Sequence, residues 1–234
     1  MTKHIGVGMD FGRRQFISGA ATAAAVGAAA QAGFELALPA RLAAQSKLTP
    51  DAALQELMAG NQRFDANQLT SIAHDLVILK ENTIEKQEPF AAVLACADSR
   101  VPVELVFDQT IGHIFVTRVA GNLVTPEIIA SLEYSVVVLG VKVVLVIGHT
   151  NCGAVKAAMK SDNVPGQISS LYQHLRRAVE QSGGSLEKAI AANAKIQADL
   201  LRTSSTVIRD ALKAGTVKVE SGVYDLGSGK VSLS

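Results

Sequence analysis

The sequence lacks tryptophan, contains only two cysteines, and carries positive and negative charges that nearly cancel. Two cysteines cannot form a closed zinc site of four cysteines, so a metal site needs histidine or carboxylate ligands as well. The 22 lysines and arginines balance the 21 aspartates and glutamates and form no basic run, so nothing indicates a nucleic-acid partner.

The first 44 residues predict a targeting segment that is not part of the fold. Arg13 and Arg14 precede an aromatic and an aliphatic residue, and residues 19–33 are almost wholly alanine, glycine, threonine and valine. We expect a cleaved twin-arginine signal peptide over residues 1–44 and a mature domain over 45–234. The mature protein is then periplasmic or otherwise extracytoplasmic, without stable membrane association. An uncleaved anchor is the alternative, but this stretch is too short and too poor in leucine and isoleucine for a spanning helix of roughly 20 residues.

A metal-binding pattern lies in the middle of the chain. Cys96 is followed by Asp98 and Arg100, and His149 stands three residues before Cys152. Thiolate sulfur and imidazole nitrogen are preferred zinc ligands, and a catalytic zinc site keeps its fourth position open for water or substrate. Two cysteines and one histidine supply three ligands, so we expect one catalytic Zn²⁺ per chain. A carboxylate such as Asp98, or another histidine, is the alternative source of a fourth ligand.

A disulfide is the competing interpretation of the two cysteines, because exported proteins commonly oxidise such pairs. A structural Cys96–Cys152 bridge, however, needs neither His149 nor the charged residues beside Cys96. Twin-arginine export also carries folded proteins, so zinc can occupy both thiolates before they meet an oxidant. We therefore favour zinc.

Continuous apolar runs alternate with helical segments, which predicts one α/β domain with a mainly parallel β-sheet flanked by helices. The predicted strands cover residues 90–95, 114–116 and 142–147, with a closing strand at 217–219 and a hairpin over 222–231. The predicted helices begin at Thr49-Pro50 and cover residues 126–139, 152–159 and 169–214, the last in two pieces broken around 182–184.

The predicted strands place the metal-binding pattern at one edge of the sheet. Cys96 and His149 each follow or end a strand, and Cys152 opens the next helix. Ligands of open α/β sheets bind beyond the carboxyl ends of the strands. A helix N-terminus also favours thiolate over thiol, which suits Cys152 as a ligand.

Three segments of this pattern resemble the β-class carbonic anhydrases. They are Cys96–Pro102 (CADSRVP), Arg118–Asn122 (RVAGN) and Gly148–Ala154 (GHTNCGA). The resemblance extends from about residue 53 to residue 224. It implies zinc held by Cys96, His149 and Cys152, and reversible hydration of carbon dioxide to bicarbonate and a proton. It also implies four parallel strands plus an edge strand, and a homodimer or dimer of dimers.

Asp98 and Arg100 are the expected catalytic pair. Zinc lowers the pKa of bound water to about 7 in favourable sites, which supplies hydroxide as the nucleophile. Arg100 can hold Asp98 in a two-pronged contact, so that the carboxylate orients the zinc-bound hydroxide and does not bind the metal. A surface salt bridge of little consequence is the alternative.

The resemblance also suggests substrate-binding residues. Gln87 stands where family members carry a glutamine that contacts substrate, and Phe115 and Tyr134 match aromatic positions that narrow the cleft, a wall shared across the dimer. Ordinary core packing is the alternative for the two aromatic residues. A bicarbonate-regulated subset of the family carries tryptophan three residues before its first cysteine ligand; Val93 stands there in this chain, which favours an open site.

The remaining histidines carry weaker predictions. His113 is a candidate proton shuttle, with a solvated loop histidine as the alternative. We interpret His74 and His174 as surface or packing residues.

Two other functions remain open from the sequence. A carbon disulfide or carbonyl sulfide hydrolase could use the same zinc ligands. A non-catalytic zinc-binding or thiol-redox protein would need neither Gln87 nor the Asp98–Arg100 pair.

Overall fold

The computed structural model describes residues 46–71, 87–161 and 163–234. The predicted signal peptide and His74 lie outside these residues. The described strands form one sheet in the order β2-β1-β3-β4-β5, in which the first four are parallel and β5 runs antiparallel to β4. The strands are β1 (Ala91–Ala95), β2 (Ile114–Arg118), β3 (Val143–His149), β4 (Lys218–Tyr224) and β5 (Val231–Leu233). The predicted α/β fold with four parallel strands and an edge strand is confirmed.

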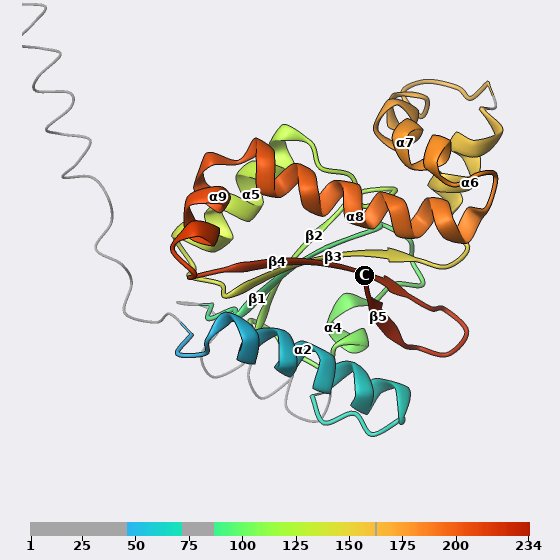
Figure 1. Ribbon diagram of the computed structural model, residues 1–234. Helices are drawn as coiled ribbons and strands as arrows, with labels where there is room; N and C mark the ends of the chain where they lie inside the picture. Colours follow the sequence, from blue (N-terminus) through green and yellow to red (C-terminus); the bar gives the residue numbers. More distant parts are fainter. Residues whose placement is uncertain (1–45, 72–86, 162) are drawn as a thin grey trace, which may run out of the picture. The chain divides into compact units, whose positions relative to one another are not determined.

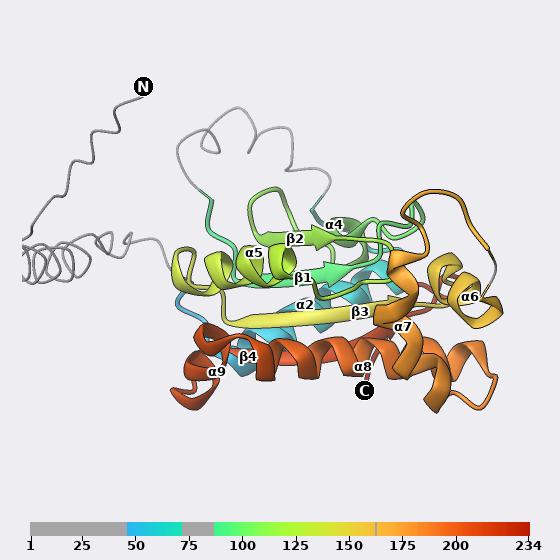
Figure 2. The ribbon, with the colours of Figure 1, turned by 90° about the horizontal axis from the view of Figure 1, so that it is seen from above.

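Helices cover both faces of the sheet (Figure 1). Helices α2 and α4 lie on one face, and α5, α8 and α9 lie on the other, while α6 and α7 lie beyond the ends toward which the parallel strands point (Figures 1 and 2). The helices are α2 (Pro50–Asp65), α4 (Val103–Val106), α5 (Pro126–Val137), α6 (Gly153–Lys160), α7 (Ser170–Gln181), α8 (Leu186–Ser204) and α9 (Thr206–Lys213). No helix of the described residues is long and apolar enough to cross a membrane.

The central strands β1 and β3 are buried along their whole length. Because successive side chains point to opposite faces of a strand, Val93 packs with the α2 and α4 layer, whereas Leu94 packs with the α5, α8 and α9 layer. This two-sided burial is the physical reason that both strands consist of continuous apolar runs.

The first predicted helix begins as expected. Thr49 is the N-cap of α2, its Oγ1 accepts a hydrogen bond from the Ala52 N–H at 3.2 Å, and proline occupies the first turn. One turn of this helix packs closely against the loop after α4, since a Cβ added to Gly60 would lie 1.8 Å from the Phe107 carbonyl oxygen. Only glycine permits that approach.

A buried carboxylate, Asp108, organises the loop after α4. Its side chain is fully buried and accepts hydrogen bonds from Arg63 Nε at 2.5 Å and from the backbone N–H groups of Thr70 and Ser71 at 2.9 and 3.0 Å. Burial by itself would raise the pKa of the Asp108 carboxyl, but these donors outweigh burial and hold the pKa well below its usual range. Asp108 therefore ties the end of α2 to the segment that follows it.

The predicted break around residues 182–184 is confirmed, since α7 ends at Gln181 and α8 begins at Leu186, but the predicted number of two helices over residues 169–214 is wrong. The chain forms three helices there, because α8 and α9 are separated at Ser205. Ser205 is extended, with φ −93° and ψ 117°, and its Oγ accepts the Ile208 N–H at 3.0 Å while donating to Glu133 Oε1 at 2.6 Å. This N-cap, anchored to α5, ends one helix and begins the next without glycine or proline.

Candidate metal centre

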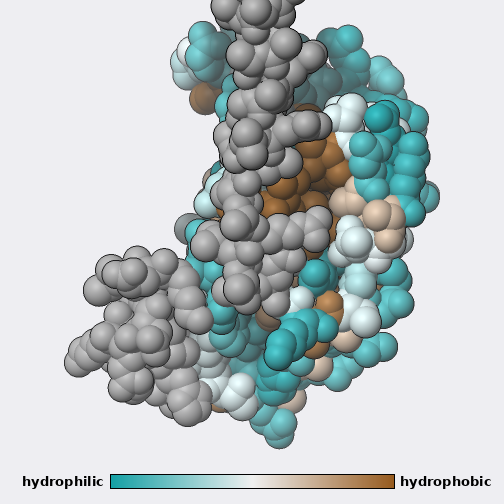
Figure 3. Space-filling view, turned by 90° about the vertical axis from the view of Figure 1, so that its left-hand side faces the viewer, coloured by the Kyte–Doolittle hydropathy of each residue, from teal (hydrophilic) through white to brown (hydrophobic). Residues whose placement is uncertain are grey.

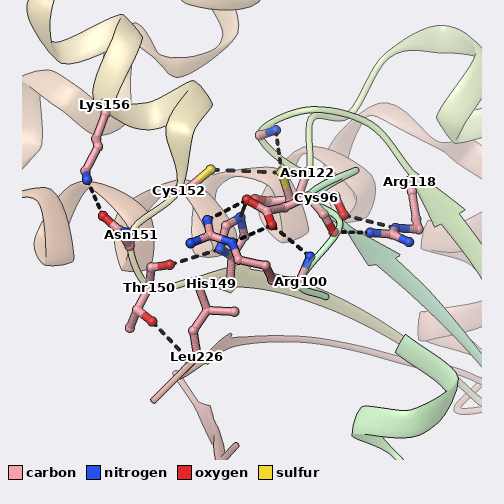
Figure 4. Close-up of polar contacts among 12 residues, drawn as sticks. Cys96, Arg100, Arg118, Asn122, His149, Thr150, Asn151, Cys152, Lys156 and Leu226 are labelled. Atoms are coloured by element: carbon pink, nitrogen blue, oxygen red, sulfur yellow. Dashed lines mark hydrogen bonds and ion pairs between the residues drawn. The ribbon is translucent and has the colours of Figure 1, made fainter. Parts of the chain in front are cut away.

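The two cysteines and His149 meet beyond the carboxyl ends of neighbouring strands. Cys96 directly follows β1, His149 is the last residue of β3, and Cys152 is the N-cap of α6. Because β1 and β3 pair in parallel, their ends lie side by side. The ligand atoms all lie within 4.8 Å of one another, with 4.0 Å between the two sulfurs (Figure 4). Within the part of the chain that the structure describes, this is the group of such residues able to hold a metal ion.

The orientation of His149 suits metal binding. The imidazole is buried, and its Nδ1 lies 3.0 Å from the Thr150 carbonyl oxygen, which can only accept, so Nδ1 carries the proton. In the neutral imidazole, Nε2 then has a free lone pair, and it finds no hydrogen-bond partner in the described residues. A buried nitrogen without a partner costs free energy, which a metal ion at this position removes. Thr150 is itself anchored, because its N–H donates to the Tyr224 carbonyl at 2.9 Å.

The two sulfurs lie in contact in a buried site and affect each other's ionisation. The contact with Cys152 lowers the pKa of the Cys96 thiol, and the Gly121 N–H, 3.3 Å from Cys96 Sγ, also lowers it. The pKa of the Cys152 thiol is raised, because Cys96 already carries the negative charge and the site is buried. A cation bound by both sulfurs would remove this conflict and permit both thiolates. The donor set of two sulfurs and one imidazole nitrogen therefore fits zinc.

Asp98 and Arg100 form the two-pronged contact expected from the sequence. Arg100 Nε donates to Asp98 Oδ1 at 2.9 Å, its Nη2 donates to Oδ2 at 2.7 Å, and its backbone N–H donates to Oδ1 at 3.0 Å. The guanidinium holds the pKa of the Asp98 carboxyl well below its usual range, so the carboxylate is ionised at neutral pH. Asp98 Oδ2 also lies 3.7 Å from His149 Nε2, which places the carboxylate at the border of the metal site.

Arg118 is a part of the site for which the sequence predicted no role. Its Nε donates to the Cys96 carbonyl at 3.0 Å, and its Nη2 donates to the Asp98 carbonyl (Figure 4). Arg118 ends β2, the neighbour of β1, so its side chain reaches the loop that carries the first ligand. Its position at the end of a predicted strand was the signal that could have revealed it.

The proposed substrate-binding residues do not reach the metal site of their own chain. Gln87 is exposed and precedes the amino end of β1, whereas Cys96 follows the carboxyl end, and five strand residues alone span about 16 Å. Phe115 pairs in register with Ala92 near the start of β1, and its ring centroid lies 6.3 Å from that of Tyr134. Any role of these three residues at a metal therefore requires a second subunit.

The structure also places His113, the candidate proton shuttle, and His174, which we interpret from the sequence as a surface or packing residue. His113 is exposed, and its carbonyl accepts the Phe90 N–H at 3.0 Å just before β1 begins. It therefore lies at the opposite end of the strands from the metal site of its own chain and is not placed to move protons there. His174 is half-buried on α7, consistent with a packing residue.

Comparison with known proteins identifies the family. A family model described as carbonic anhydrase matches residues 91–231, which include all three candidate ligands. The chain belongs to the β-class carbonic anhydrases. A carbonic anhydrase of Mycolicibacterium smegmatis is 34% identical over 192 residues, covering 79% of this chain and 93% of that protein. Carbonic anhydrase 2 of Mycobacterium tuberculosis is 31% identical over 204 residues, with 79% and 92% covered.

Solved structures agree with this assignment. A β-carbonic anhydrase of Coccomyxa matches with a TM-score of 0.60 and 27% identity, covering 77% of this chain and 85% of that one. A β-carbonic anhydrase of Aspergillus fumigatus matches with a TM-score of 0.62 and 26% identity, covering 77% and 90%. A carbonic anhydrase is a carbonate dehydratase, a lyase, and the Cys96, His149 and Cys152 cluster is typical of the zinc site of the β class.

Proposed function

We propose that this chain hydrates carbon dioxide reversibly, with Cys96, His149 and Cys152 holding zinc and the Asp98–Arg100 pair orienting the attacking oxygen. The observation that carries the proposal is the combination of three converging ligand atoms with a carboxylate that Arg100 holds at their border. Zinc in such a site supplies a positive charge that makes water a nucleophile near neutral pH. Three protein ligands leave a position for that water.

Asp98 acts in this proposal by orientation, not by storing the proton. Its lowered pKa makes it a weak base, but an ionised carboxylate still accepts a strong hydrogen bond from an adjacent hydroxyl. That hydrogen bond fixes which lone pair faces carbon dioxide. Arg100 keeps both carboxylate oxygens engaged, so Asp98 does not take the open ligand position itself.

A second subunit completes the substrate site in this proposal. β-Carbonic anhydrases form oligomers, and one from Sordaria macrospora is described as tetrameric. Tyr134 and Val137 are large apolar side chains on α5 that are 46% and 51% exposed. Figure 3 shows a hydrophobic area on the side of this domain at which the strands begin. Exposed apolar surface of this kind suits a homodimer contact, and we propose that it carries Gln87, Phe115 and Tyr134 to the partner's site.

Carbon dioxide hydration followed by stopped flow tests the catalytic proposal, with zinc quantified in the same sample between about pH 6.5 and 9. Fast hydration at one zinc per chain supports it. Full zinc loading without hydration at any pH refutes it and points to a sulfur-containing analogue such as carbonyl sulfide. Protein without zinc and without free thiols points to the disulfide.

We also propose export of this chain by the twin-arginine route, followed by cleavage near residue 44. The support is the Arg13-Arg14 pair and the alanine- and glycine-rich stretch behind it. Cell fractionation of the full chain tests this, with Arg13→Lys/Arg14→Lys as the matched variant. Equal amounts of wild type and variant outside the cytoplasm would contradict the proposal.

A further inference from the structure

Two buried amide side chains on α8 hold the loop that follows β2. Asn193 and Gln197 lie one helical turn apart, and both are almost completely buried. Asn193 Nδ2 donates to the Gly121 carbonyl at 2.8 Å, and Gln197 Oε1 accepts the Val124 N–H at 2.8 Å. Gln197 Nε2 donates to Asn193 Oδ1 at 3.1 Å, which links the two side chains. The pair therefore fixes both ends of a four-residue loop segment.

The same loop makes a direct contact with a zinc ligand. The Gly121 N–H donates to Cys96 Sγ at 3.3 Å, so both backbone groups of Gly121 are engaged, one by the sulfur and the other by Asn193. On the strand side, the Val119 N–H donates to the Ala95 carbonyl at 3.2 Å. The Gly121 amide is thus held against the sulfur from two directions.

The backbone of this loop needs such support. Gly121 has φ +79°, which glycine adopts freely, but Asn122 has φ 46°, a left-handed conformation that costs free energy for a residue with a side chain. Without Asn193, the buried Gly121 carbonyl would lose its hydrogen-bond donor. The loop could then turn until this carbonyl reaches another donor. The amide would then leave the sulfur.

An N–H donor to a metal-bound thiolate draws negative charge from the sulfur and fixes its direction. Groups that orient and tune ligands in this way affect metal affinity as well as catalysis. Hydrogen bonds in a buried chain such as Gln197–Asn193–Gly121 also polarise one another. A packing role for the two side chains would require only their volume, not their polar atoms.

We propose that Asn193 and Gln197 are positioning residues for the zinc ligand Cys96, acting through the Gly121 amide. The inference rests on the zinc site of the proposed function but not on its catalytic step. Neither side chain contacts the metal ligands directly. Their effect passes through one backbone amide.

Asn193→Leu and Gln197→Leu test the proposal, because leucine fills a similar volume without a donor. Zinc affinity of the full chain is measured by competition with a chromophoric chelator, and the thiolate-to-metal absorption band is recorded after substitution with cobalt(II). We expect about 10- to 100-fold weaker zinc binding for Asn193→Leu and a shifted cobalt band, with a smaller effect for Gln197→Leu. Ile208→Ala, which shortens a fully buried side chain on α9, is the control for general destabilisation.

The outcomes separate this inference from the proposed function. Wild-type zinc affinity and an unshifted cobalt band in the folded leucine variants overturn the inference alone. An equal shift in Ile208→Ala also overturns it, because general destabilisation would then explain the effect. If Asn193→Leu does not fold, Gln197→Leu decides. A wild-type chain that binds no zinc overturns both proposals, whereas zinc binding without hydration overturns only the catalytic one.

Discussion

Replacing Asp98 by asparagine separates the proposed catalytic contribution of this carboxylate from its contribution to folding. The Arg100 side chain is 49% exposed, so the ion pair is screened by solvent and contributes about 0–1 kcal/mol to the free energy of unfolding. For a domain of this size, that corresponds to a change in melting temperature of less than about 4 °C. Zinc should be retained, because none of its three ligands changes.

The expected effect of Asp98→Asn on activity is much larger. A group that orients the reacting atoms contributes about 10²- to 10³-fold to the rate, or about 2.7–4 kcal/mol of transition-state stabilisation. We therefore expect kcat/KM for carbon dioxide to fall by about 10²- to 10³-fold. Stopped-flow hydration, zinc content and thermal melting of the same sample measure the three quantities together.

Arg100→Leu tests whether Arg100 keeps the Asp98 carboxylate out of the metal site. Asp98 Oδ2 already lies 3.7 Å from His149 Nε2, so a carboxylate released from Arg100 needs little movement to enter the metal site. Activity should fall at least as far as in Asp98→Asn, and the double variant should be no worse than the poorer single variant. Additive losses would contradict a shared role.

Asp199→Asn provides the matched control for the Asp98 variants. Asp199 forms a comparable exposed ion pair with Arg202 at 2.6 Å. Both residues lie on α8, and neither belongs to the proposed catalytic pair. It should leave both hydration and zinc content unchanged. Full activity of Asp98→Asn at one zinc per chain would refute the orienting role of Asp98, and loss of zinc in that variant would refute its separation from metal binding.

Three other substitutions test the metal site and the fold. Cys152→Ser should lose zinc and lower the melting temperature, as measured by metal analysis and thermal melting; full zinc content in this variant would contradict its role as a ligand. Asp108→Asn should cost about 2–4 kcal/mol of unfolding free energy at pH 7, because it weakens a buried contact with Arg63. The depressed pKa of Asp108 means that its stabilisation is present above the unfolded pKa of about 3.9 and is lost as pH falls toward the folded value. Denaturant unfolding should therefore show a smaller difference between variant and wild type at about pH 3 than at pH 7, and an equal difference would be evidence against this linkage. Gly60→Ala should destabilise by about 2–3 kcal/mol in the same assay, since its Cβ meets the Phe107 carbonyl; unchanged stability would show that α2 shifts freely.

The fold and the metal ligands were predictable because their signals are local in the sequence. Strands buried on both faces must consist of continuous apolar residues, which is why β1 and β3 could be located. Cys96 and His149 stand at the ends of those runs, where parallel strands deliver side chains to one edge. The Asp98–Arg100 contact spans only two residues, so chain geometry alone brings the two side chains together.

Other features depend on contacts between distant segments. The break at Ser205 comes from a hydrogen bond to Glu133, 72 residues away, and no glycine or proline announces it. Asn193 is one polar residue among many on an amphipathic helix until packing brings its amide to Gly121. The separation between Phe115 and the metal site of its own chain likewise comes from the three-dimensional structure, because it is set by the length of the strands.

The sequence by itself determined the strand segments and the types of metal ligand, because periodicity and residue chemistry are read along the chain; the leader stays a prediction. Tertiary structure alone decided that β1 and β3 are neighbours, that α8 supports the loop at Cys96, and that Gln87 lies at the far end of β1. The physical reason is that burial favours apolar residues at every buried position, which produces a pattern along the sequence. A single hydrogen bond between residues about seventy positions apart produces no such pattern, since any polar side chain of suitable length could have made it.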